Sequence, residues 1–539
     1  MKKSRRYLSL LLTAALAGGA LAACGGSGST ASTTAAGSQA AAETAAPAAA
    51  GETQAAAESA GAGKTDIIIA MPEDLETFDP AGSSAMVTMA TTKMMYTRLY
   101  DTHDDSQPVP LLAQEMIEVS DNEVDFKIPE GVKFSDGSDL NAEDVVASLE
   151  RARQSPTFST LMKGIISFEK GEDDYTIKCN TDGPVPYIRL ALSHAGTGII
   201  PKEYAEAGES ADWDHPVCSG PYILSSRTLG SETVIEKNPD YWDNGGETEA
   251  KNEKLTFKVV PEASSRTIQV QTGEADVSFN FSTADYNTVS SDPNVTLYQK
   301  TGTVTQYLCM NTRLAPFDNE KVRLAVCYAI DREAIMTIVA DGFGTVTGST
   351  IPPTTNGWVD NPAGYTYDPE KAKELLKEAG YPDGFETKIL AFNDLGKRVC
   401  EASQQYLADV GIKANIETYD SSVRLDMSAN DQIPFMAAQW GAMSDCALVL
   451  PRLFTEAAIG GMNFSKYTNP ELDELFAKAQ NTYDAKVREE AYQECVKILA
   501  DKAPWCPIYI PDSFVLARAD LQGVHQDGES IILLNQLHY

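Results

Sequence analysis

The sequence has little positive charge, little histidine and no second long apolar segment after its first residues. Its 539 residues contain 43 Lys and Arg against 77 Asp and Glu, which gives a formal net charge of −34. This acidity argues against nucleic acid as a partner. The five histidines, at 103, 194, 215, 525 and 538, show no metal-ligand spacing. We therefore expect no bound metal and no cofactor.

Motifs that carry chemistry in enzymes are also missing. The sequence contains no GxSxG, GxxxxGK[ST], HExxH or GxGxxG pattern, and we expect a protein without catalytic residues. Eight cysteines follow Cys24, and none is spaced as CxxC. Most have apolar neighbours, which favours buried free thiols, although an extracellular location leaves disulfides open.

The N-terminus has the pattern of an export signal. Four basic residues among the first six precede an uncharged stretch over 7–23, which ends in Leu21-Ala22-Ala23-Cys24. This resembles the bacterial lipobox, which implies a signal peptide over 1–23, a diacylglyceryl group on Cys24 and location at the outer face of the cell membrane. The alternative is an ordinary secretory signal with a chance cysteine. Residues 25–64 contain no Val, Ile, Leu, Met or aromatic residue, which predicts a flexible tether over 24–64.

The remaining chain mixes strand and helix patterns. The clearest helix is 368–380, where Asp368 is the N-cap, Pro369 is the first helical residue and Gly380 ends the helix. A second helix is expected from about 485 to 500. Strands are expected over 65–70, 385–390 and 412–419. This succession is typical of an α/β protein.

Segments spread over the whole body resemble the family-five extracytoplasmic solute-binding proteins, which include dipeptide and oligopeptide receptors of ABC importers. The most specific is Pro-Glu-Gly-Val-Lys-Phe-Ser-Asp-Gly at 129–137, followed by Asn-Ala-Glu-Asp-Val-Val at 141–146. The other matching segments are 77–80, 111–113, 219–222, 238–242, 273–276, 322–325, 329–332, 351–354, 367–380, 467–473 and 503–505.

The resemblance implies a two-lobed periplasmic-binding-protein-like α/β fold with an extra subdomain, a hinge between the lobes and a ligand cleft. We expect lobe one over 65–303 plus 507–539, with the subdomain at about 83–200, and lobe two over 304–506. In such a protein the solute shifts an equilibrium between open and closed forms. A monomer that delivers short peptides to an ABC permease and its ATPase is the expected function.

The resemblance also nominates residues at the two ends of a bound peptide. In peptide-binding relatives an Asp three residues after a Trp pairs with the amino terminus, but here that position is Met443. We expect Asp445, in the same loop as Trp440 and Gly441, to bind the amino terminus instead. The alternative is that Asp445 is a solvated loop residue. Dipeptide receptors place an Arg for the carboxylate before a helix of lobe two. Here Lys397 or Arg398 is the candidate, with an exposed helix charge as the alternative for either.

Further candidates are side chains suited to the peptide backbone and to the walls of the cleft. Ser83 and Ser84 align with a loop that hydrogen-bonds peptide backbone, and turn formation is their alternative role. Trp358, Tyr307 and Trp440 are expected as cleft aromatics unless they pack in the core. The departures around Trp440 leave a non-peptide solute open, such as an oligosaccharide or a nickel chelate. An extracellular enzyme and a sensory or adhesive surface protein are weaker alternatives.

Overall fold

The computed structural model describes residues 63–102, 107–246, 248–441, 444–528 and 530–539. All of these residues belong to one compact unit. The expected signal peptide, Cys24 and nearly all of the expected tether lie outside the described residues. Within the described ranges, no helix has the length and apolar character needed to span a bilayer.

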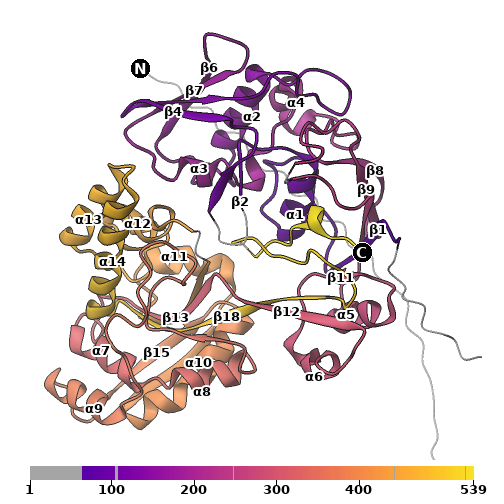
Figure 1. The fold of residues 1–539 in the computed structure, drawn as a ribbon. Coiled ribbons are helices and arrows are strands. Elements are labelled where there is room, and N and C mark those ends of the chain that lie inside the picture. Colours follow the sequence, from indigo (N-terminus) through magenta and orange to yellow (C-terminus); the bar gives the residue numbers. More distant parts are fainter. Residues whose placement is uncertain (1–62, 103–106, 247, 442–443, 529) are drawn as a thin grey trace, which may run out of the picture. The chain divides into compact units, whose positions relative to one another are not determined.

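A mixed sheet of twelve strands organises this unit (Figure 1), in the order β16-β15-β17-β13-β18-β11-β1-β10-β9-β8, with β12 and β14 also paired to β18. Lobe one is the half that contains β1 Asp66–Met71, β8 Tyr222–Thr228, β9 Glu232–Lys237, β10 Lys254–Val259, β11 Val277–Ser278 and β12 Val295–Thr301. Its helices are α1 Met86–Met95, α4 Lys202–Ala207, α5 Ala263–Thr272 and α6 Tyr286–Val289.

A separate four-stranded sheet, in the order β4-β5-β7-β6, lies within the segment expected to form the extra subdomain. Its strands are β4 Glu115–Ser120, β5 Glu123–Lys127, β6 Ile165–Lys170 and β7 Thr176–Thr181, accompanied by the hairpin of β2 Tyr100–Thr102 and β3 Pro108–Pro110 and by helices α2 Ala142–Gln154 and α3 Ile188–Ala191. Helix α2 begins with a capping box, in which Asn141 and Asp144 accept each other's backbone N–H groups.

Lobe two is the other half of the main sheet. Its strands are β13 Val304–Met310, β14 Gly344–Val346, β15 Phe385–Ala391, β16 Ile412–Thr418, β17 Phe435–Gly441 and β18 Trp505–Arg518. Its helices are α7 Glu320–Ala329, α8 Arg332–Val339, α9 Pro369–Glu378, α10 Asp394–Asp409, α11 Arg424–Ala429, α12 Leu450–Phe454, α13 Pro470–Gln480 and α14 Ala485–Lys502. The predicted helices at 368–380 and 485–500 are confirmed as α9 and α14, and the predicted strands as β1, β15 and β16.

Alternation along β13 sends its side chains into two different cores. Leu308 and Met310 pack with residues of α7 to α10 on one face of the lobe-two sheet. Tyr307 and Cys309 pack on the opposite face with residues of α12 to α14 and with residues of the extra subdomain. We call this second face the inner face of lobe two. The eight described cysteines are all buried and free, which confirms the prediction for them.

Two strand connections join the lobes. Strand β12 leads through Gly302 into β13, and the long strand β18 pairs with β13 along one half and with β12 and β11 along the other (Figure 1). The Gly302 N–H donates to the Pro511 carbonyl at 3.1 Å, and a Cβ at position 302 would lie only 2.4 Å from that oxygen. This connection requires glycine at 302 because the two backbones approach so closely.

Candidate functional site

The inner face of lobe two has an aromatic wall on β13 and β17. These antiparallel strands place Thr305 opposite Trp440 and Tyr307 opposite Ala438, so all four side chains lie on one face. The Tyr307 ring stacks on Trp505 of β18, with ring centroids 3.6 Å apart and planes 9° from parallel. The structure thus brings together two predicted aromatics, Trp440 and Tyr307, on the face that the extra subdomain covers.

Two loops are fastened together at the edge of this wall. The Asn356 N–H donates to the Ser444 carbonyl at 3.0 Å, and the Cys446 N–H donates to Asn356 Oδ1 at 2.7 Å. The Gly357 N–H donates to Glu489 Oε2 of α14 at 2.8 Å. The loop that carries Trp358 is therefore held against the loop that follows Trp440, and both tryptophans pack on the same apolar cluster.

Several buried polar atoms on these elements have no hydrogen-bond partner in the described part of the chain. They are Thr305 Oγ1, Ser349 Oγ, Thr350 Oγ1, Thr354 Oγ1, Trp358 Nε1 and Trp440 Nε1. Buried polar groups are nearly always hydrogen-bonded, either to protein or to ordered water, and a solute can take the place of that water. Donors and acceptors of this kind, next to an aromatic wall, suit a polar organic solute with apolar parts.

Asp445 lies at this edge of the wall, and its carboxylate is paired. Arg488 of α14 donates one terminal nitrogen to both carboxylate oxygens, at 2.7 Å to Oδ1 and 2.6 Å to Oδ2. The Ala447 N–H donates to Oδ1 at 2.9 Å. Burial lowers the pKa of Arg488, but the nearby Asp445 carboxylate outweighs this and the pKa is raised. Arg488 was not among the predicted site residues, because nothing in the sequence marks it as different from the other charges on α14.

The extra subdomain reaches the same place from lobe one. Burial and the nearby Asp445 carboxylate raise the pKa of Tyr187, which precedes α3 and whose hydroxyl donates to the Lys163 carbonyl at 2.5 Å. The Val185 N–H donates to the Tyr483 hydroxyl of lobe two at 3.3 Å. Groups from both lobes therefore lie near Asp445.

The other predicted site residues have different surroundings. Ser83 is buried in the turn before α1, where its hydroxyl donates to Glu76 and accepts from the Ala85 N–H at 3.0 Å. Ser84 and Gly441 are exposed. Arg398 is exposed on α10 and donates to the Ile338 carbonyl at 3.1 Å. Helix α10 packs on the face of the lobe-two sheet opposite to Trp440, so the structure does not bring Arg398 to the aromatic wall.

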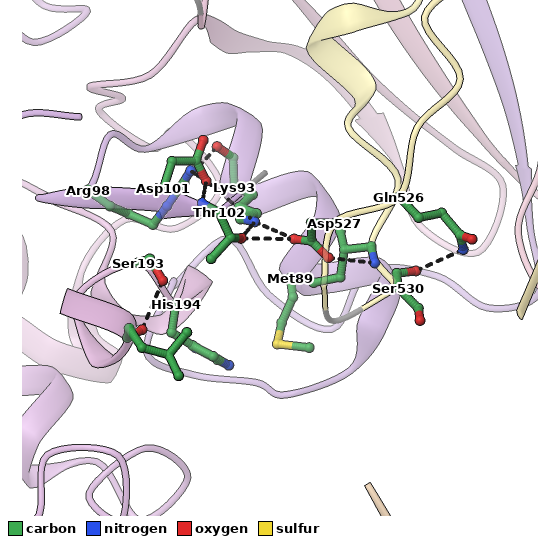
Figure 2. A network of polar contacts seen from close by, with 12 residues as sticks. Met89, Lys93, Arg98, Asp101, Thr102, Ser193, His194, Gln526, Asp527 and Ser530 are labelled. Carbon is green, nitrogen blue, oxygen red and sulfur yellow. Dashed lines mark hydrogen bonds and ion pairs between the residues drawn. The ribbon is translucent and has the colours of Figure 1, made fainter. Parts of the chain in front are cut away.

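A second group of charges lies within lobe one and is internally balanced (Figure 2). Lys93 Nζ of α1 lies 2.6 Å from Asp527 Oδ2 and 3.1 Å from Thr102 Oγ1, and Arg98 lies 2.9 Å from Asp101. Burial raises the pKa of Asp101, but the two cations outweigh it and lower the pKa to about 2. These paired charges fasten the C-terminal segment to α1. The described residues contain no cluster of His, Cys, Asp and Glu that could hold a metal ion.

Comparisons with known proteins agree with this architecture. Residues 107–458 match the model for bacterial extracellular solute-binding proteins, family 5 Middle. The chain is 30% identical to the glutathione-binding protein GsiB of Salmonella typhi over 471 aligned residues. The alignment covers 84% of this chain and 90% of that protein. The GsiB of Escherichia coli O157:H7 is also 30% identical, over 474 residues that cover 85% of this chain and 91% of that protein.

Two solved structures share the fold over nearly their whole length. HbpA2 from Haemophilus parasuis superposes with a TM-score of 0.80 at 26% identity, covering 88% of this chain and 99% of that one. DppA from Helicobacter pylori, solved in complex with the peptide STSA, has a TM-score of 0.71 at 26% identity, covering 88% of this chain and 98% of that one. The chain therefore belongs to the bacterial extracellular solute-binding proteins of family 5, with their two-lobed α/β fold.

Proposed function

We propose that this chain is the receptor of an ABC importer that captures short peptides outside the cell and delivers them to a membrane permease. The observation that carries the proposal is the set of unpartnered polar atoms beside the aromatic wall of lobe two. Its relatives support the peptide as solute, since one is named for glutathione, which is itself a short peptide, and another holds the peptide STSA.

The proposed site divides recognition between backbone and side chains of the peptide. Thr305, Trp440 and Trp358 offer hydroxyl and indole N–H groups to the peptide backbone, with the exposed backbone of Gly441 beside them. The Trp440 and Trp358 rings, which are only partly buried, accept varied side chains, because apolar contact has no directional requirement. The proposal therefore predicts tolerance of side-chain shape.

The amino terminus of the peptide is assigned to Asp445. A carboxylate has about four lone-pair positions, and in Asp445 Oδ1 accepts two hydrogen bonds whereas Oδ2 accepts one. Oδ2 therefore retains a position for an ammonium group. Because Arg488 already neutralises the carboxylate, this contact supplies direction more than net Coulomb attraction.

Closure follows from contacts that only a bound solute makes to both lobes. The hinge at Gly302 and Pro511 lets the lobes separate, and a solute that touches Trp440 and the extra subdomain together stabilises the closed form. No catalytic step is part of the proposal. The receptor acts as a monomer that presents the closed form to its permease.

A lipid on Cys24 would hold the receptor at the outer face of the membrane, with residues 25–64 as tether. Two acyl chains anchor a protein stably whereas one does not. Cells expressing the full chain should incorporate radiolabelled palmitate into it and retain it in the membrane fraction. The Cys24→Ser variant should be unlabelled and released, and a labelled or retained variant would count against the anchor.

The solute is tested with the chain from residue 25 onward, purified gently and analysed by native mass spectrometry for retained ligand. After unfolding and refolding to remove that ligand, isothermal titration with pools of di-, tri- and tetrapeptides should give saturable heat. Trp440→Ala should weaken binding at least about tenfold, whereas Trp213→Ala, the same substitution in lobe one, should not. Heat from another solute class and none from any peptide would refute the peptide assignment.

A further inference from the structure

Three cationic side chains follow β13 along the inner face of lobe two. The Arg452 guanidinium of α12 lies 5.6 Å from the centre of the Trp440 ring. The Arg424 guanidinium of α11 lies 5.1 Å from the centre of the Phe464 ring. Lys466 is only 3% exposed. We refer to Arg452, Arg424 and Lys466 as the cationic row.

The row is ordered along alternate residues of β13. Arg452 adjoins Trp440, the strand partner of Thr305. Phe464, on whose ring Arg424 lies, belongs to the same buried cluster as Tyr307. Burial raises the pKa of the Tyr307 hydroxyl, and the Arg424 charge acts against that rise. In the same way burial raises the pKa of Cys309 and Lys466 acts against it.

None of the three cations has a carboxylate partner within the described ranges. No ion pair within 4.0 Å and no side-chain hydrogen bond involves any of them, although Lys466 feels the charge of Asp431 from farther away. Other buried arginines in the described part of the chain do have partners, since Arg488 pairs with Asp445 at 2.6 Å and Arg323 donates to the backbone carbonyls of Lys502 and Phe317. With 77 Asp and Glu against 43 Lys and Arg, acids are not scarce.

Burial makes these charges costly in the absence of an anion. It lowers the pKa of Arg452 and of Lys466, the direction expected when a cation loses water without gaining a partner. An anion that binds beside these cations offsets the free-energy cost of their burial. Partly buried cations of this kind therefore favour a negatively charged ligand. The aromatic rings beneath the two guanidinium groups restrict their orientation, which suits the flat, two-pronged binding of a carboxylate.

We propose that the solute is an acidic short peptide, with a Glu or Asp carboxylate in addition to its C-terminal one, and that Arg452 and Arg424 bind these two carboxylates. A neutral peptide brings one carboxylate to three cations and leaves the row under-neutralised. This inference rests on the proposed function, since it names the chemical class of the peptide.

The test compares tripeptides that differ only in charge. Isothermal titration of the refolded chain uses Ala-Glu-Ala against Ala-Gln-Ala, with Glu or Gln moved to the first and third positions in two further pairs. For at least one position the Glu peptide should bind about 10- to 100-fold more tightly than its Gln partner, the usual range for a charge-assisted hydrogen bond. Equal affinities at all three positions would overturn the inference and leave the peptide receptor standing.

Variants then assign the effect to the row. Arg452→Gln and Arg424→Gln should each reduce the Glu-over-Gln preference at least fivefold while leaving Gln-peptide affinity within about threefold. Arg153→Gln, on α2 of lobe one, removes the same single charge and should leave the preference unchanged. Circular dichroism melts identify a misfolded variant, and either arginine variant suffices if the other fails to fold. If folded Arg452→Gln and folded Arg424→Gln both retain the Glu-over-Gln preference, the assignment to these arginines is wrong. If no peptide binds to the parent protein, both this inference and the proposed function are wrong.

Discussion

Breaking the Asp445–Arg488 pair should destabilise the protein strongly from either side. Asp445 is 7% exposed and Arg488 is 7% exposed, and they meet at 2.6 and 2.7 Å. Asp445→Asn leaves a buried guanidinium without its counter-charge, and Arg488→Met leaves a buried carboxylate in the same condition. Removal of one partner from a buried pair costs about 3–5 kcal/mol of unfolding free energy.

An exposed pair in the same lobe provides the reference. Lys321 and Glu378 lie 2.8 Å apart with both side chains 50% exposed, so Glu378→Gln should cost no more than about 1 kcal/mol. The distance between the partners is nearly the same in the two pairs. The difference between the two costs therefore measures burial.

Urea unfolding of the refolded chain, followed by tryptophan fluorescence, gives the free energies. If lobe two unfolds as one unit of roughly 200 residues, each kcal/mol corresponds to about 2–4 °C in Tm, so each single variant should melt about 6–20 °C lower. The double variant Asp445→Asn with Arg488→Met should be less destabilised than the sum of the single ones by at least about 2 kcal/mol. Losses below about 1 kcal/mol for both single variants would refute the reasoning.

Three further perturbations test other parts of the structure. Tyr307→Ala removes a buried ring stacked on Trp505 at 3.6 Å and should cost about 3–5 kcal/mol in urea unfolding, whereas Tyr307→Phe should cost under about 1.5; equal losses would contradict the stacking argument. The pKa of Asp101 is lowered from 3.8 to about 2, which adds roughly 2 kcal/mol to the free energy of unfolding above pH 4. This contribution is lost as the pH falls through 2, so Asp101→Asn should make stability less dependent on pH in that range. An unchanged pH dependence would mean that other groups cause the acid sensitivity. Gly302→Ala places a methyl group 2.4 Å from the Pro511 carbonyl oxygen. The variant should lose about 1–3 kcal/mol of unfolding free energy and show a different ratio of open to closed forms in small-angle scattering. A variant equal to the parent in both measurements would show that the two backbones can separate enough to accommodate the methyl group.

Elements specified by neighbouring residues were predictable. Helix α9 begins at Pro369 because Asp368 accepts from the Lys371 N–H at 2.9 Å, and Gly380 after it has a φ of +93°. Each of these interactions spans fewer than five residues, so the sequence pattern contains all of the information. The family resemblance supplied what local patterns cannot, namely the two-lobed α/β architecture.

Partners that are distant in sequence were not predictable. Asp445 and Arg488 are 43 positions apart, and no local pattern distinguishes Asp445 paired with an arginine from Asp445 facing solvent. Arg398 illustrates the same limit, because its position on α10 fixes a helix face but not the face of the sheet on which the helix packs. Arg452 and Arg424 could not be predicted as site residues from the sequence, because the absence of a carboxylate partner is a property of three-dimensional packing.

The net charge of −34 does not conflict with an acidic solute. At physiological ionic strength the Debye length is about 8 Å, so most surface carboxylates are screened from a ligand at the inner face of lobe two. Arg452 and Lys466 are partly or fully withdrawn from solvent and are screened less. Added salt should therefore remove the long-range repulsion of an approaching acidic peptide and speed association, while weakening the short-range contacts and speeding release. Because the dissociation rate governs most differences in affinity, acidic tripeptides should bind less tightly as the salt concentration rises. Tighter binding at high salt would mean that repulsion by the surface carboxylates controls the affinity.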